Sequence, residues 1–125
     1  MLILAAAIVS AITFFVHTFI GGKFVARPLL DDTHLPKASK WLNYYCWHVT
    51  TVTIIFLTVA FVGLHVSVPL TERTVLIFLA AFTSSLSALS ALVALKGGIN
   101  PLRFPSTSLF ALIAICAWLA VAGGY

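Results

Sequence analysis

The stretch from Trp41 to Val66 decides the fold of this chain, and it reads WLNYYCWHVTTVTIIFLTVAFVGLHV. It holds no Asp, Glu, Lys or Arg. A helix needs about 20 consecutive, mostly apolar residues to cross the hydrocarbon core of a bilayer, and this stretch exceeds that length. We therefore expect one transmembrane helix here.

Three further apolar segments flank this stretch. The first begins at Met1, and Gly21-Gly22 predicts its end, because glycine terminates helices at little cost. Pro28 and Pro36 follow and argue against one long helix in the connection. No positive region precedes the first segment and its apolar run is too long for a signal peptide, so we expect a retained helix. The four expected spans are Met1 to Ile20, Trp41 to Val66, Thr74 to Leu95 and Ser106 to Ala122, with a short turn at Ser67 to Arg73.

The composition supports a membrane protein. Hydrophobic residues make up 62% of the 125 residues and charged residues only 8%, whereas a soluble domain is about 25% charged. A soluble fold of this length cannot bury so much apolar surface, so lipid must act as the solvent. We expect an all-α, multi-pass integral membrane protein that forms one four-helix bundle over residues 1–125, with a bacterial cytoplasmic membrane as its location.

The basic residues predict an orientation. Four of the seven lie between the first two spans, two lie between the last two, and one lies in the middle connection. The positive-inside rule then places the first and third connections in the cytoplasm and both termini on the outer side. Topology and lipid headgroups explain the net charge of +4 better than nucleic acid does, so we expect no nucleic-acid partner.

Several kinds of chemistry lack support. The only carboxylates, Asp31, Asp32 and Glu72, lie in connections, whereas proton- or sodium-coupled transporters usually keep an acidic residue within the bilayer. Paired-carboxylate catalysis is equally unsupported. Cys46 and Cys116 form no CxxC motif, and neither a GxSxG motif nor a phosphate-binding glycine loop is present. We predict no catalytic residue and no metal cluster, and we favour a protein that is not an enzyme.

His17 and His48 are the main candidates for a site. Each lies about six residues from the middle of its expected span, roughly 9 Å toward the cytoplasmic side, so the two rings could face each other across adjacent antiparallel helices. One hypothesis is a bis-histidine site for haem b or another metal. The other is hydrogen bonding of each ring within the bundle. A lipid headgroup or small-molecule site is a third. The candidate cofactor-binding residues are His17, His48, Tyr44, Tyr45, Thr13 and Thr51.

The aromatic residues at the start of the second span have two interpretations. They could stack on a quinone or a haem ring, but their position and type match the anchors that gather at a membrane interface. We favour interface anchors. The residues concerned are Trp41, Tyr44, Tyr45 and Trp47.

The third span carries small residues at regular intervals. Ala80, Ser84 and Ala88 recur every four residues, and such spacing lets helix backbones approach closely in a membrane. We therefore expect this helix to be central in the bundle. The leading function is a non-enzymatic accessory or structural subunit that packs with itself or with a larger membrane complex, in contact with membrane lipid. The alternatives are a haem- or metal-binding electron-transfer protein and a small oligomeric transporter or channel lined by the serine-rich third span.

Overall fold

The computed structural model describes residues 1–66 and 72–123, and these residues form helices and short connections without any strand. Four helices are long and apolar enough to cross a membrane: residues 2–31, Lys37–Val66, Arg73–Lys96 and Pro105–Ala122. The all-α, four-helix architecture expected from the sequence is therefore confirmed. Most of the expected turn from Ser67 to Arg73 lies outside the described residues.

The first helix is longer than predicted. It continues without a break from α1 (Leu2–Phe15) through a π-helical segment, η1 (Val16–Ala26), into α2 (Arg27–Asp31). The expectation that Gly21-Gly22 ends this helix is wrong. A glycine costs a helix only about 1 kcal/mol relative to alanine, so packing can override it.

Pro28 is also accommodated inside the first helix. It lies in the first turn of α2, where the winding returns from π to α, and the last π-type bond runs from the Arg27 N–H to the Gly22 carbonyl. Proline is tolerated in the first turn of an α-helical segment because the N–H groups of that turn have no hydrogen-bond partner within the segment, so a missing N–H costs no bond.

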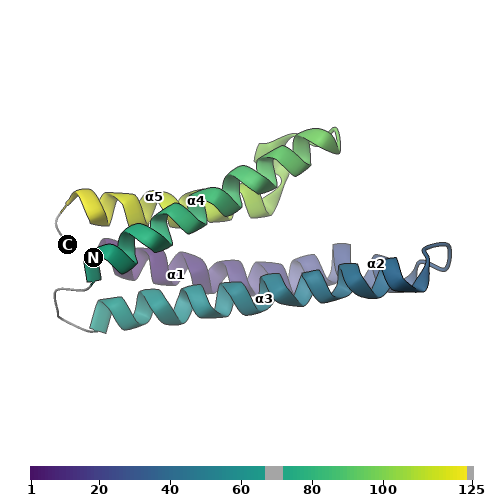
Figure 1. The fold of residues 1–125 in the computed structure, drawn as a ribbon, viewed down its shortest axis with the longest axis horizontal. Helices are drawn as coiled ribbons and strands as arrows, with labels where there is room; N and C mark the ends of the chain where they lie inside the picture. Colours follow the sequence, from purple (N-terminus) through teal and green to yellow (C-terminus); the bar gives the residue numbers. More distant parts are fainter. Residues whose placement is uncertain (67–71, 124–125) are drawn as a thin grey trace.

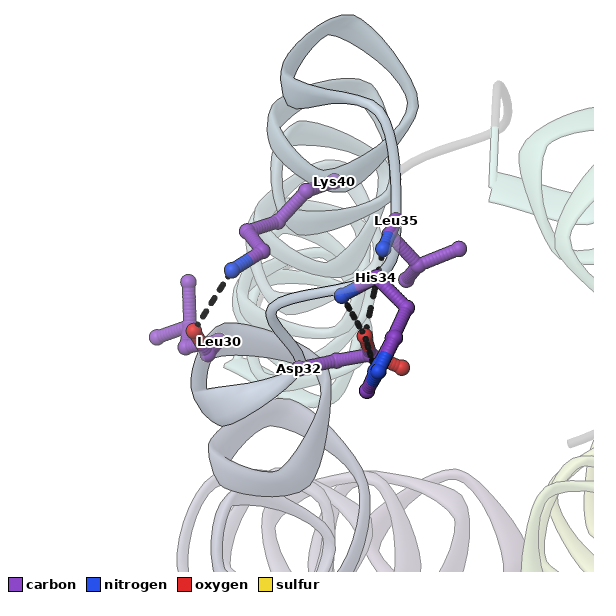
Figure 2. Close-up of polar contacts among 5 residues, drawn as sticks. All are labelled: Leu30, Asp32, His34, Leu35 and Lys40. Carbon is purple, nitrogen blue, oxygen red and sulfur yellow. Dashed lines mark hydrogen bonds and ion pairs between the residues drawn. The ribbon is translucent and has the colours of Figure 1, made fainter.

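The first connection is a short, well-bonded turn. Asp32 Oδ1 accepts hydrogen bonds from the backbone N–H groups of His34, at 2.7 Å, and Leu35, at 3.1 Å (Figure 2). Lys40 Nζ donates to the Leu30 carbonyl at 2.9 Å and so satisfies a carbonyl near the end of the first helix. These bonds turn the chain directly into α3 (Lys37–Val66).

The helices form two hairpins, as Figure 1 shows. The first helix pairs with α3, and α4 (Glu72–Lys96) pairs with α5 (Pro105–Ala122) after the short 3₁₀ segment η2 (Pro101–Arg103). Contact between α1 and α5 joins the hairpins, whereas α3 and α4 scarcely touch. The hairpins diverge toward the end that carries the connections at residues 32–36 and 97–104, and the start of α1 and the end of α5 lie at the other end.

The buried core follows this arrangement. Large core side chains such as Phe61, Ile54, Leu76 and Ile113 are almost fully buried. The α1 and α5 contributions include small residues, which allow the two backbones to come close. The core cluster consists of Ile3, Ala6, Ala7, Ile54, Leu57, Phe61, Leu76, Leu79, Ala80, Phe110, Ile113, Ala117 and Ala120.

The third span is not the central helix that its small residues suggested. Its main neighbour is α5, so it lies at one side of the bundle, and α1 and α5 are the helices with two close neighbours each. Its buried face repeats every three and four residues instead of every four. A strict spacing of four drifts by about 40° per step around a helix with 3.6 residues per turn. The residues on the α5 side are Leu76, Ala80, Thr83, Ser87, Ser90 and Ala94.

Hydroxyl groups hold α4 against α5. Ser87 Oγ donates to the Thr107 carbonyl at 2.9 Å, and Ser90 Oγ lies 2.9 Å from both Ser106 Oγ and Thr107 Oγ1. The indole N–H of Trp118 donates to Ser84 Oγ at 3.1 Å. Because these bonds cross between the two helices, they fix the α4–α5 hairpin as one unit.

Two adjacent substitutions test which face of α4 is packed. Ser87→Leu places a branched side chain against Thr107 and should destabilise the fold by about 1–3 kcal/mol, the usual cost of overpacking. Ala88→Leu adds the same bulk to an exposed position and should change stability little. Equilibrium unfolding in mixed micelles with a denaturing detergent measures both. Equal losses for the two variants would contradict the observed face.

Candidate functional site

His17 lies in the first turn of the π-helical segment and packs against α3. Its ring stacks on the indole of Trp47, with ring centroids 3.9 Å apart and planes inclined by 17°. Its Nε2 lies 3.1 Å from Thr51 Oγ1 and 3.3 Å from the Trp47 carbonyl oxygen. The Thr51 hydroxyl donates to that same carbonyl at 3.1 Å. The hydroxyl oxygen is then free to accept the Nε2–H of a neutral imidazole, which satisfies its donor.

Gly21 makes room for the Trp47 side chain. A Cβ atom added at Gly21 would lie only 2.5 Å from Cη2 of the Trp47 ring, whereas one added at Gly22 meets nothing within 4 Å. Gly21 follows His17 by four residues, so both face α3 along one side of the first helix. The indole therefore rests on this side of the helix, against the imidazole and the glycine backbone.

Trp47 has a packing role that the sequence analysis missed. Its position near the start of an apolar span predicted an interface anchor, and Trp41 and Tyr45 are indeed largely exposed. Trp47 instead is half-buried between two helices. The available signal was the pair of glycines in the first helix, since a glycine that does not end a helix often marks a close approach by a neighbour.

His48 has a different environment from His17. It is exposed, and its ring meets the Tyr44 ring edge to face at a centroid distance of 4.5 Å. Within the described residues its ring has no hydrogen-bond partner. His48 and Trp47 are consecutive, so they point about 100° apart around α3. Trp47 faces the first helix, and His48 consequently faces the open side toward α4.

The six predicted site residues thus separate into three places. His17 and Thr51 are in contact between the first helix and α3. His48, Tyr44 and Tyr45 lie on the more exposed faces of α3, and His48 and Tyr45 line a groove. Thr13 is buried and donates to the Val9 carbonyl of its own helix at 2.8 Å, whereas His17 bonds to residues of α3.

The groove lies between α3 and α4, where the hairpins diverge. It has a volume of about 600 Å³ and is open to the outside along its length. No charged side chain from the described residues lines it, and its aromatic residues include Phe78 and Phe82, whose rings stack at 6.0 Å. The lining residues are Tyr45, His48, Val49, Val52, Thr53, Phe56, Leu57, Ala60, Phe78, Leu79 and Phe82.

A second, smaller hollow of about 360 Å³ lies between the first helix and α3, bounded in part by Cys46, Asn43 and Leu29. Cys46 is a free, exposed thiol. Among the described residues, no three His, Cys, Asp or Glu side chains come close enough to hold a metal ion. The groove between α3 and α4 is larger than this hollow, and His48 is one of its lining residues.

Gly21→Ala and Gly22→Ala form a matched test of the tryptophan contact. The Gly21 variant must displace the Trp47 ring and should destabilise the protein by about 1–3 kcal/mol. The Gly22 variant should be neutral or stabilising by up to about 1 kcal/mol, because alanine favours a helix. Emission of Trp47, isolated by Trp41→Phe and Trp118→Phe, should shift in the Gly21 variant alone. Identical behaviour of the two variants would contradict this packing.

No model of a known protein family, no curated protein and no solved structure matches this chain. Its function is therefore inferred from its own contacts.

Proposed function

We propose that this protein is a non-enzymatic accessory subunit of a membrane assembly, which packs with itself or with the helices of a larger complex. The support is the lateral position of α4. This helix has one close neighbour, α5, and leaves much of its surface free. Membrane helices associate mainly through close packing, so a free helix surface with small side chains favours a further helix as its neighbour.

The outer face of α4 has the side chains for such a contact. Ala81, Ser85 and Ala88 are exposed and follow one another at intervals of four and three residues, so they share one side of the helix. The Ser85 hydroxyl donates to the Ala81 carbonyl at 2.9 Å, and it needs no partner from outside the helix. A second helix could approach this side closely without burying an unsatisfied polar group.

The polar groups inside the bundle also favour a structural role. Ser10 Oγ lies 2.9 Å from Thr58 Oγ1, and Thr83 donates to carbonyls of its own helix. Of the buried side-chain oxygen and nitrogen atoms in the described residues, Thr18 Oγ1 is the exception without a partner. Hydroxyls that are already bonded in this way stabilise helix contacts and are not positioned to activate a substrate.

The orientation belongs to the same proposal. We place the first and third connections in the cytoplasm and both termini outside, in accord with the basic residues. The start of α1 and the end of α5 lie at one end of the bundle and both connections at the other (Figure 1). The two connections would therefore share one side of the membrane in either orientation, and their basic residues decide which side we propose. A bacterial cytoplasmic membrane is the location we propose.

The α4 face is tested by Ala88→Leu and Ser85→Leu, which add bulk to the exposed stripe. Each should reduce self-association or recovery of a partner several-fold while leaving the fold intact. Single-molecule photobleaching of the labelled protein in native membrane particles counts the copies, and affinity purification from the same particles identifies a second subunit. Val62→Phe, at an exposed position on α3, is the control. A protein that is alone and monomeric in these particles would refute the proposal.

The haem alternative needs His17 and His48 to face each other, but His17 lies between the first helix and α3 and His48 lines the groove between α3 and α4. The fit to a haem is poor, because Nε2 of His17 is held by Thr51 and its ring face is covered by Trp47. We expect no Soret band in protein expressed with ample haem, and we expect His17→Ala to destabilise the bundle. A Soret band that both His17→Ala and His48→Ala abolish would establish the alternative instead.

The transporter alternative relied on the serines of the third span. Ser87 and Ser90 bond to residues of α5, so their hydroxyls are used in helix contact instead of along a path for solutes. We therefore rank this alternative last.

A further inference from the structure

The hydrogen bonds between helices all lie within one hairpin or the other. In the first hairpin Ser10 bonds to Thr58, and in the second Ser87 bonds to the backbone of Thr107. Among the described residues, no hydrogen bond and no ion pair joins the first hairpin to the α4–α5 hairpin. Because hydrogen bonds are directional, they fix the geometry inside each hairpin, but they do not fix the angle between the two.

The contact that joins the hairpins is apolar. It is made by α1 and α5, and both helices bury alanines, such as Ala6 in α1 and Ala117 in α5. Helices in a membrane are held together by van der Waals packing as well as by hydrogen bonds, and here packing acts alone. Packing has no preferred bond direction, and packed helices can slide over one another by small amounts. The contact therefore permits a change in the angle between the hairpins.

The core that joins the hairpins lies at one end of the molecule. We call this the closed end, where α1 starts and α5 ends, and we call the other end, where the hairpins diverge, the open end (Figure 1). The core cluster takes its α3 members from residues 54–61 and its α4 members from residues 76–80. These segments lie near the closed end, where α3 ends at Val66 and α4 begins at Glu72. The covalent link and the shared core are thus both at the closed end.

The facing walls of the groove can come together without burying a charge. Phe56 on α3 and Phe78 on α4 are 70% and 63% exposed, and no charged residue of the described chain lines the groove. The Thr53 hydroxyl is already bonded within its own helix. The other polar lining residues, Tyr45 and His48, lie toward the open end of α3. Lipid solvates apolar side chains about as well as protein does, so closing the groove changes the free energy little in either direction.

We propose that the two hairpins rock as rigid bodies on the α1–α5 contact, so that α3 and α4 move together and the groove between them closes. The arrangement described above is the open state. The motion is a shear between packed helices, and a small shift at the closed end becomes a larger displacement at the open end. It breaks no hydrogen bond, because none crosses between the hairpins in the described part of the chain. No partner on the outer face of α4 is needed, so this inference does not rest on the proposed function.

Distances between spin labels test this motion in the full chain. The two native thiols are free and are removed by Cys46→Ser and Cys116→Ser. Labels are then attached to Leu42→Cys on α3 and Leu95→Cys on α4, both 63% exposed and near the open end. Double electron–electron resonance in lipid nanodiscs should give a broad distribution for this pair, with a separate component at shorter distance from the closed state.

Three further pairs of labels serve as controls, all at exposed residues. One pair lies within each hairpin, and both should give a single narrow distance because the hairpins are rigid. The third pair crosses between α3 and α4 near the closed end and should also be narrow, because the pivot lies there. The pairs are Phe24→Cys with Leu42→Cys, Leu92→Cys with Leu112→Cys, and Val62→Cys with Val75→Cys.

Filling the groove should hold it open. Val49→Phe combined with Val52→Phe enlarges two exposed groove residues and should remove the component at shorter distance. Val59→Phe makes the same change at an exposed position on α3 outside the groove, and it should keep that component. Thermal unfolding checks that each variant folds, and Val52→Phe alone replaces the combined variant if that one does not fold.

The outcomes separate clearly. An open-end distribution as narrow as those of the hairpin controls overturns the proposal, and so does a component at shorter distance that the groove-filling variant retains. Equal breadth within a hairpin would show that the hairpins are not rigid, and equal breadth at the closed end would show that the pivot is elsewhere. Either result overturns the proposed motion.

Discussion

Close approach of α1 to α5 is the constraint on which the rest of the structure depends. In a lipid environment apolar side chains gain little by leaving the solvent, so helices are held by van der Waals packing and interhelical hydrogen bonds. The two helices with two close neighbours each bury several alanines: Ala6 and Ala7 in α1, and Ala114, Ala117 and Ala120 in α5. This contact joins the hairpins, and the divergence of their other members, α3 and α4, leaves the groove open.

The number and approximate position of the helices could be predicted from the sequence, because length and apolarity alone decide whether a segment can cross a bilayer. The extension of the first helix through Gly21 and Pro28 could not. Local preference predicts a stop there, and only the indole of Trp47 from another helix explains why a glycine is needed inside the helix. The prediction that the third span, α4, is the central helix was wrong for a related reason. Serines and alanines at intervals of four favour α4 as the central helix, but α4 packs closely on α5 alone, whereas α1 and α5 each have two close neighbours.

The residues of the candidate site could be named from the sequence, but their arrangement in space could not. Depth along a helix follows from counting residues, and that placed His17 and His48 near one level. Direction around the helix decides which partner each ring meets. His17 faces Trp47 and Thr51, and His48, one position beyond Trp47, faces the groove. A sequence gives relative direction within a helix, but the absolute direction depends on how the helices pack.

Three faces of α4 differ in their side chains and in their surroundings. One face bonds to α5 through Ser87 and Ser90, and these bonds set how α4 is rotated against α5. A second face, with Phe78 and Phe82, borders the groove, and the third carries the exposed small residues. Because the first face fixes the rotation of the helix, the other two point in different directions and must meet different neighbours. Small side chains suit a second helix that must come close, whereas large aromatic side chains keep another backbone at a distance. The side-chain sizes on α4 therefore favour its outer face, with Ala81, Ser85 and Ala88, for the helix contact that we propose.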